Sequence, residues 1–464
     1  MERPKATVTM AYVTGRSVGI GAYCSRLCQR VIQHAEAPLI LTGASALNKV
    51  LGREVYASNA QIGGPRVMGA NGVSHLVVTD DVRGVSSILR WLSYVPKRKG
   101  APLPFLSPAA AIASSDGGFD TIHRSIGFVP GATPHDPREM LHHFFDRGSF
   151  MEVMTDWGRS VVTGRARLGG LAVGAVAVET RASTKTVPAD PAFEGAQIAE
   201  ETQAGQVWFP DSAFKTAQAI GDMNREGLPL IIFANWRGFA GGLRDMYGEI
   251  LKYGAYIVDA LREYDQPIFV YIPHGGELRG GAWVVIDSSI NPEKMEFYAS
   301  DESKGGVLEP EGVVDIKFRR EDLVKAMRRT CPAMQDGSKF HGEDGKTAEK
   351  KLEKELMPTF KQLATHFAAL HDTPGVMLHK RAIREIVPWS QARTFFASRL
   401  RMRVAEERVK ALVRGKVPDV SAQQMATHLS TVAATLEEIA AAEDDGVAPE
   451  EREEVRAMID ALTR

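Results

Sequence analysis

Short apolar runs alternate with amphipathic segments along the first 320 or so residues. The pattern predicts strands at residues 6–13 (ATVTMAYV) and 38–43 (PLILTG), with an amphipathic helix at residues 22–35 (AYCSRLCQRVIQHA) between them. Ser45 is a candidate N-cap for the helix that follows. A strand, a helix and a second strand in this order predict an α/β unit with parallel strands.

A second unit follows from about residue 149. Residues 161–180 (VVTGRARLGGLAVGAVAVET) predict a β-hairpin, because two apolar runs flank the pair Gly169-Gly170. Helices are then expected at residues 214–227 and 244–264, and buried strands at residues 229–234 and 267–273. The turns GRSVGIGAY and ELRGGAWVV look alike, which indicates two copies of one α/β unit, the first of them incomplete.

The remaining segments differ from these two units. Residues 96–148 are rich in Pro, Gly, His and Asp, as in PKRKGAPLP and GFVPGATPHDPRE, and predict a linker or irregular connection. Beyond Arg319 the chain is charged, with apolar spacing of three and four that predicts packed amphipathic helices, before an acidic end at residues 444–454. The expected organisation is therefore a first unit at 1–95, a linker at 96–148, a second unit at 149–320 and a helical extension at 321–464.

Composition narrows the class of protein. With 44% hydrophobic and 24% charged residues the chain is globular in composition, and a net charge of −1 gives no general attraction to nucleic acid or to a membrane surface. No apolar run is long enough to span a membrane, and no signal or transit sequence precedes the first strand. Cys24 and Cys28 are expected to pack as small apolar groups, and three cysteines favour a reducing compartment such as the cytoplasm, with a plastid left open.

Three glycine-rich turns follow predicted strands: TGRSVGIG, NWRGFAGG and ELRGGA. Ligands of open α/β sheets bind beyond the carboxyl ends of the strands, where exposed backbone N–H groups can hold an anion. The second turn carries Arg237 directly after a buried strand, and a guanidinium in such a place needs an anionic partner.

Other chemistries lack their motifs. The chain has no dinucleotide fingerprint, no Walker sequence, no H-E-x-x-H and no G-x-S-x-G elbow, so NAD, ATP, a catalytic metal and a serine nucleophile are not indicated. A site rich in arginines and backbone donors suits a reaction that passes through an enolate, with carboxylates held by bidentate arginines. No protein base is then required if a cofactor handles the proton.

Longer motifs add a family resemblance. VTGRSVGIGAY, SALNKVLGREVY, GQVWFPDSAFKTAQAI, ANWRGFAGG, ELRGGAWVV and VLEPEG closely resemble the carboxyltransferase region of eukaryotic, multidomain acetyl-CoA carboxylases, and the similarity runs from about residue 7 to about residue 410. The resemblance implies two crotonase-like halves and transfer of a carboxyl group from carboxybiotin to acetyl-CoA, giving malonyl-CoA for fatty-acid biosynthesis. It also implies a head-to-tail homodimer whose active site joins the first half of one subunit to the second half of its partner.

Site residues follow from the same resemblance. Arg16 and Arg237 match arginines implicated in carboxylate recognition, and Gly19 and Gly281 match glycines whose N–H groups stabilise an enolate or the biotin urea oxygen. The positions expected to contact substrate are Ile20, Tyr23, Phe239, Ile250 and Gly280. Taken without the resemblance, each arginine could be held by an internal carboxylate, each glycine could relieve backbone strain, and the apolar residues could belong to the core.

Some expected features are missing. The family's first half begins upstream of the motif TVTMAYVTGRS, near which this chain opens, and neither a biotin-attachment M-K-M nor an ATP-grasp loop is present. Biotin would therefore arrive on a separate carrier domain, charged by a separate biotin carboxylase. Two alternatives stay open at this point: a carboxyltransferase for another acyl-CoA such as propionyl-CoA, and an incomplete, non-catalytic chain that acts as an assembly partner.

Overall fold

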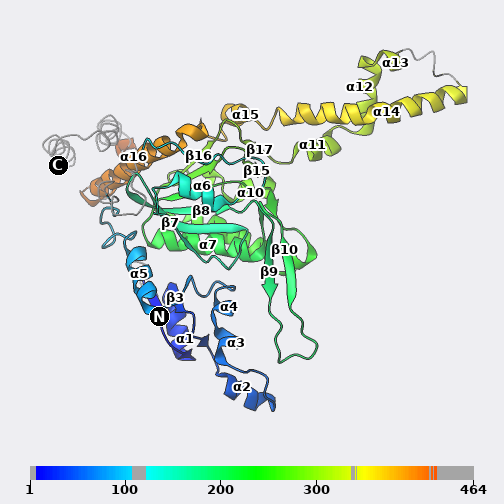
Figure 1. Cartoon of the computed structure of the whole chain (residues 1–464). Coiled ribbons are helices and arrows are strands. Elements are labelled where there is room, and N and C mark those ends of the chain that lie inside the picture. Colours follow the sequence, from blue (N-terminus) through cyan, green and yellow to red (C-terminus); the bar gives the residue numbers. More distant parts are fainter. Residues whose placement is uncertain are drawn as a thin grey trace.

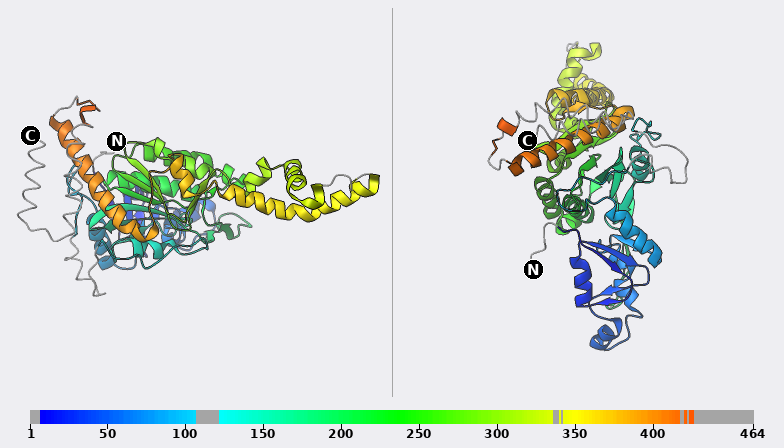
Figure 2. Two further views of the ribbon diagram at one scale, coloured as in Figure 1. Left: turned by 90° about the horizontal axis from the view of Figure 1, so that it is seen from above. Right: turned by 90° about the vertical axis from the view of Figure 1, so that its left-hand side faces the viewer.

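The computed structural model describes residues 7–106, 122–335, 340, 342–416, 420–421 and 423–425, so the acidic end lies outside the described residues. Figure 1 shows an elongated chain with the N-terminal unit at one end, a large sheet in the middle and a helical arm at the other end. The right-hand view of Figure 2 shows the same order. The class is α/β, as the alternation of strands and helices predicts.

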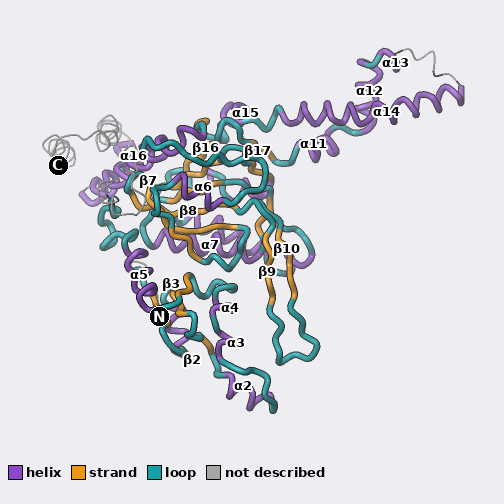
Figure 3. Tube along the Cα trace, in the orientation of Figure 1, coloured by secondary structure: helices purple, strands orange, loops and turns teal. Residues whose placement is uncertain are grey.

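The first unit is built on a small parallel sheet. Its order is β1-β3-β5, and β2 pairs with β4 beside it. Helices α1 and α5 contact the three-stranded sheet, whereas α2 lies at the far tip of the unit (Figure 3). The bounds are β1 (Met10–Val13), β2 (Ser17–Val18), α1 (Ile20–Leu27), β3 (Arg30–His34), β4 (Leu39–Ile40), α2 (Ala44–Leu51), α3 (Asn59–Gly63), α4 (Pro65–Met68), β5 (Leu76–Val78) and α5 (Asp81–Leu92).

The single helix expected at residues 22–35 is wrong in its second half. Helix α1 ends at Leu27, and the next residues form β3, the central strand of the first sheet. Strand β3 is buried on both sides, with Val31 and Ile32 fully inaccessible, so pairing with β1 and β5 overrides the local helical pattern. Cys24, which lies within α1, is exposed rather than packed.

The central sheet of the second unit has seven strands in the order β18-β16-β14-β12-β8-β7-β6. Strands β8, β12, β14, β16 and β18 run parallel, while β6 and β7 are antiparallel to their neighbours. The predicted hairpin is confirmed: Gly169 and Gly170 have φ of 56° and 83°, as a primed turn requires. The bounds are β6 (Met151–Val153), β7 (Val161–Leu168), β8 (Leu171–Val178), β12 (Leu230–Phe233), β14 (Ile268–Ile272), β16 (Met295–Ala299) and β18 (Glu385–Ile386).

Alternate residues of each strand enter separate cores on the two faces of this sheet. In β12, Leu230 and Ile232 pack with α7 (Pro210–Arg225) and α9 (Ile250–Arg262), whereas Ile231 and Phe233 pack on the other face. That second face is covered by α6 (Pro137–Phe144) and α16 (Trp389–Lys416). The run PLIIF is thus a fully buried strand, as its continuous apolar character predicts.

The irregular connection expected at residues 96–148 is wrong for its last part. Residues 137–144 form α6, capped by the Asp136 side chain, which accepts a hydrogen bond from the Arg138 N–H. Phe144 and Phe145 are fully buried against the central sheet. Proline at the first helical position marks a helix start as readily as it marks a loop, which is why composition alone misassigned this segment.

An arm and a hairpin project from the second unit. The arm contains α11 (Pro310–Lys317), α12 (Arg320–Thr330), α13 (Pro332–Gln335) and α14 (Gly342–Ala369), which share a small core of their own. Helix α15 (Pro374–His379) leads back to the sheet, so the helices predicted beyond Arg319 are confirmed for the described residues. The hairpin of β9 (Ser183–Val187) and β10 (Ala199–Gln203) extends beside the first unit (Figure 1), where Tyr56 donates a hydrogen bond to Asp190.

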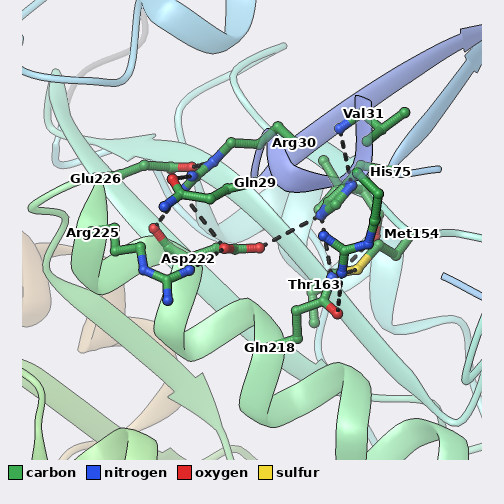
Figure 4. A network of polar contacts seen from close by, with 12 residues as sticks. Gln29, Arg30, Val31, His75, Met154, Thr163, Gln218, Asp222, Arg225 and Glu226 are labelled. Carbon is green, nitrogen blue, oxygen red and sulfur yellow. Dashed lines mark hydrogen bonds and ion pairs between the residues drawn. The ribbon is translucent and has the colours of Figure 1, made fainter. Parts of the chain in front are cut away.

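A buried ion network joins the first unit to the central sheet. The Arg30 Nε of β3 lies 2.7 Å from Glu226 at the end of α7, and Arg165 of β7 contacts the same carboxylate at 2.8 Å. Close by, His75 Nε2 is 3.5 Å from Asp222 (Figure 4). Because these side chains are almost fully inaccessible, the network fixes how the two units meet.

Candidate functional site

Two turns of the second unit meet beyond the carboxyl ends of β12 and β14. The first runs from Asn235 into β13 (Gly238–Phe239), and the second leads through β15 (Glu277–Arg279) into α10 (Gly280–Val285). Asn235 ties them together, because its Oδ1 accepts hydrogen bonds from the Glu277 N–H at 2.9 Å and from Gln206 Nε2 at 2.6 Å. Buried Trp236 stacks on Trp208 with 3.9 Å between ring centroids, which gives the first turn a rigid base.

Arg237 stands on this base with half of its side chain exposed. Its Nε donates a hydrogen bond of 2.6 Å to Glu277 Oε1, and Glu309 lies 3.7 Å from the same atom. Within the described part of the chain, its two terminal nitrogens have no hydrogen-bond partner. The edge of the guanidinium that can hold a carboxylate in bidentate fashion is therefore open.

Glu277 is itself held by a second arginine. Its Oε2 accepts a hydrogen bond of 3.0 Å from Arg279 Nε, and Arg279 Nη1 lies 2.5 Å from Asp372 Oδ2. Burial tends to raise the pKa of Glu277, but the hydrogen bonds from Arg279 and Arg237 outweigh it and hold that pKa below its ordinary value. The carboxylate is thus an ionised acceptor and not a proton donor at neutral pH.

Sequence reasoning missed these partners of Arg237. The Glu-x-Arg spacing in ELRGG was a usable signal, because residues i and i+2 of a strand lie on the same face. No comparable signal exists for Asp372, which is 93 residues from Arg279 and is brought to it by the return of the chain from the arm.

Helix α10 supplies backbone donors next to Arg237. Gly280 and Gly281 are its first two residues, whose N–H groups have no acceptor inside the helix. Gly280 has φ of 47°, a conformation that favours glycine, and a Cβ on Gly281 would lie 3.6 Å from the Phe239 ring. Arg237, Phe239, Gly280 and Gly281 therefore lie together in the two turns that follow β12 and β14.

The first unit carries the other predicted residues. Arg16 lies exposed in the loop between β1 and β2, and no ion pair or hydrogen bond engages its side chain among the described residues. Tyr23 of α1 borders a mostly apolar cavity of about 440 Å³ that Leu39 and Leu47 also line. Ile20 begins α1 and is 81% exposed.

Two expected roles need correction. The Gly19 N–H is donated to the Ile40 carbonyl at 2.9 Å, so Gly19 is not the open donor of its turn. The N–H groups of Ile20 and Gly21, the first two residues of α1, have no acceptor inside the helix and are the open donors of this turn instead. Ile250, the first residue of α9, is only 2% exposed and packs in the hydrophobic core, so within one chain it lines no open surface.

Neither a metal-binding cluster nor a membrane-spanning helix is found among the described residues. The described residues contain no group of three or more His, Cys, Asp or Glu side chains arranged to hold a metal ion. Of the helices that the structure describes, none is both long and apolar enough to cross a membrane.

The sequence of the chain is similar to those of known proteins. The chain is 49% identical to an acetyl-CoA carboxylase of Dictyostelium discoideum over 91% of its own length, and 48% identical to acetyl-CoA carboxylases of Oryza sativa subsp. japonica and Schizosaccharomyces pombe over similar spans. It covers only 19% of the length of each of these relatives.

A solved structure confirms the fold. Transcarboxylase 12S, crystallised with methylmalonyl-coenzyme A and methylmalonic acid, superimposes with a TM-score of 0.64 at 20% identity. The match covers 86% of this chain and 66% of that one. The carboxyl transferase domain family matches residues 4–404, and the chain belongs to this family.

Proposed function

We propose that this chain catalyses the carboxyltransferase step of an acetyl-CoA carboxylase, in which acetyl-CoA receives a carboxyl group and becomes malonyl-CoA. The observation that carries the proposal is the open edge of Arg237 beside the first N–H groups of α10. A bidentate arginine recognises a carboxylate, and preorganised backbone donors stabilise an enolate oxygen. Relatives about 48% identical that bear the name acetyl-CoA carboxylase support the choice of acetyl-CoA.

Carboxybiotin on a separate carrier domain would supply the carboxyl group when bound. The residues present fit it, because Arg237 offers two terminal nitrogens that no other described residue engages, and α10 offers backbone donors within the same turn cluster. In this proposal Arg237 holds and orients the carboxylate, and the N–H groups of Gly280 and Gly281 face the oxygen that gains charge. Phe239, lying against Gly281, shields that position from water.

We further propose that a second copy of the chain completes the site. Arg16 and the start of α1 lie in the first unit, whereas Arg237 and α10 lie in the second (Figure 1). An exposed arginine that has no partner among the described residues fits a carboxylate bound between two subunits. In this arrangement the two units, at residues 1–95 and 149–320, contribute from opposite subunits of a head-to-tail dimer.

Biotin-dependent decarboxylation of malonyl-CoA tests the function. We expect Arg237→Ala to lower kcat/KM by roughly 10²–10³-fold, since it removes charge from the position where the carboxylate binds. Because Arg237 is half exposed, the thermal unfolding of the Arg237→Ala variant should stay close to that of the unaltered chain. Arg262→Ala is the matched control: this arginine is 64% exposed and also contacts one carboxylate, that of Asp259, on α9.

Three results would contradict the proposal. Equal losses of activity and thermal stability in Arg237→Ala would make the arginine structural. Turnover of methylmalonyl-CoA alone would replace acetyl-CoA by propionyl-CoA as the acceptor. A chain that is monomeric by light scattering and inactive would favour the non-catalytic alternative.

A further inference from the structure

Arg237, Glu277, Arg279 and Asp372 form one continuous chain of ion pairs. It begins in the exposed turn after β12 and ends at Asp372, in the segment between the arm helix α14 and α15. The successive contacts are 2.6 Å from Arg237 to Glu277, 3.0 Å from Glu277 to Arg279 and 2.5 Å from Arg279 to Asp372. Exposure falls along it, from 51% for the Arg237 side chain to 3% for that of Arg279.

The buried end of this chain is rigid. Asp372 is 6% exposed, and its carbonyl accepts a hydrogen bond of 2.9 Å from the Gly305 N–H of β17 (Lys304–Gly306). Arg279 Nη1 also donates to the Leu308 carbonyl at 3.2 Å. A Cβ on Gly306 would lie 2.7 Å from Asp372 Oδ1, so the strand accepts the carboxylate only because it has glycine there. These contacts therefore hold the Arg279 side chain in one orientation, and Arg279 in turn holds the Glu277 carboxylate.

The geometry at Glu277 distinguishes between two possible roles, which are to block the substrate position or to orient Arg237. A carboxylate that plugged the substrate position would bind the terminal nitrogens of Arg237, as a bidentate ligand does. Glu277 instead uses one oxygen on the inner Nε and gives the other oxygen to Arg279. It thus leaves the outer edge of Arg237 open and restricts rotation of the guanidinium.

We infer that Glu277 is a positioning residue that aims Arg237 at a substrate carboxylate, and that the C-terminal part of the chain, through Asp372 and Arg279, holds Glu277 in place. This inference rests on the proposed function and deepens it. It gives the segment that follows the arm a part in substrate recognition. Groups that orient a residue in contact with the ligand act through geometry, and removing them weakens the contact without abolishing it.

The test compares ligands that differ only in the carboxylate. Dissociation constants for malonyl-CoA, acetyl-CoA and coenzyme A are measured by calorimetry on the full-length chain and on Glu277→Gln. Gln replaces one of the two acceptor oxygens by an NH2 donor, so it cannot repeat the two contacts in which each arginine binds a different oxygen. We expect malonyl-CoA to bind roughly tenfold more weakly to Glu277→Gln, with acetyl-CoA binding unchanged. Asp372→Asn changes a residue two contacts away from Glu277. It should therefore weaken malonyl-CoA binding by a smaller factor and likewise leave acetyl-CoA binding unchanged.

Glu152→Gln is the matched control. Glu152 of β6 is 16% exposed against 14% for Glu277, and it receives two hydrogen bonds of 2.7 Å from Arg138. This variant should lose comparable stability and keep the preference for malonyl-CoA. A merely structural role for Glu277 would weaken acetyl-CoA and malonyl-CoA alike, and that result would overturn the inference.

Two other outcomes are decisive. Tighter binding of malonyl-CoA by Glu277→Gln would show that the carboxylate competes with substrate, contrary to the inference. If the unaltered chain binds malonyl-CoA no better than coenzyme A, the proposed function fails and the inference fails with it. If the unaltered chain prefers malonyl-CoA and Glu277→Gln keeps the same preference, the inference fails while the proposed function stands.

Discussion

The junction between the first unit and the central sheet depends on the charge of Glu226. Its side chain is fully inaccessible and accepts hydrogen bonds from Arg30 Nε at 2.7 Å, from Arg165 at 2.9 and 2.8 Å, and from Trp91 Nε1 at 3.1 Å. Glu226→Gln removes the charge that these two buried arginines share. The nearest remaining carboxylate is Asp222, 3.8 Å from Arg30 (Figure 4).

The expected loss of stability is large. Breaking a buried ion pair by removing one partner costs about 3–5 kcal/mol, because the other charge stays buried without compensation. For a unit of some 150–250 residues this corresponds to a fall in Tm of roughly 6–20 °C. Hydrogen exchange should rise first in β1, β3 and β5, since these strands are joined to the rest of the chain through Arg30.

Thermal unfolding of three variants checks this reasoning. Glu263→Gln changes an exposed glutamate close in sequence to α9 and should stay within about 0.5 kcal/mol of the unaltered chain. Arg30→Met combined with Glu226→Gln should cost less than the sum of the single changes, because both remove the same contact. A loss below about 1 kcal/mol for Glu226→Gln, or additive effects in the double variant, would refute the claim that this ion pair joins the units.

Two further predictions concern pH and backbone strain. Burial lowers the pKa of His75 from its ordinary value of 6.5. Below pH 6.5 the unfolded chain then binds more protons than the folded chain, so stability falls as the pH drops through this value. His75→Gln should flatten that part of the plot of Tm against pH, and an unchanged slope would contradict the prediction. Gly170 has φ of 83° and a Cβ there would lie 2.6 Å from the Leu106 carbonyl, so Gly170→Ala should cost about 1–2 kcal/mol in denaturant unfolding. Gly221→Ala, in open space on α7, should instead stabilise by about 1 kcal/mol, and the reverse order would refute the strain argument.

Local patterns in the sequence determined much of the fold. The pair Gly169-Gly170 between two apolar runs specified the hairpin, because both residues adopt positive φ. Continuous apolar residues marked β12 and β14 as strands buried on both faces. Arg237 could be singled out beforehand because it closely follows such a strand, whereas Phe239, Gly280 and Gly281 were named from the family resemblance.

Tertiary structure decided the rest. Residues 30–34 fit an amphipathic helix locally, yet they form β3 because β1 and β5 flank them and Glu226 binds Arg30. The N–H of Gly19 is consumed by Ile40, a contact that depends on how β2 lies beside β4. Asp372 reaches Arg279 only through the return of the chain from the arm. Short-range patterns fix dihedral angles and buried faces, whereas the partner of a charged group depends on which distant segments the fold brings together.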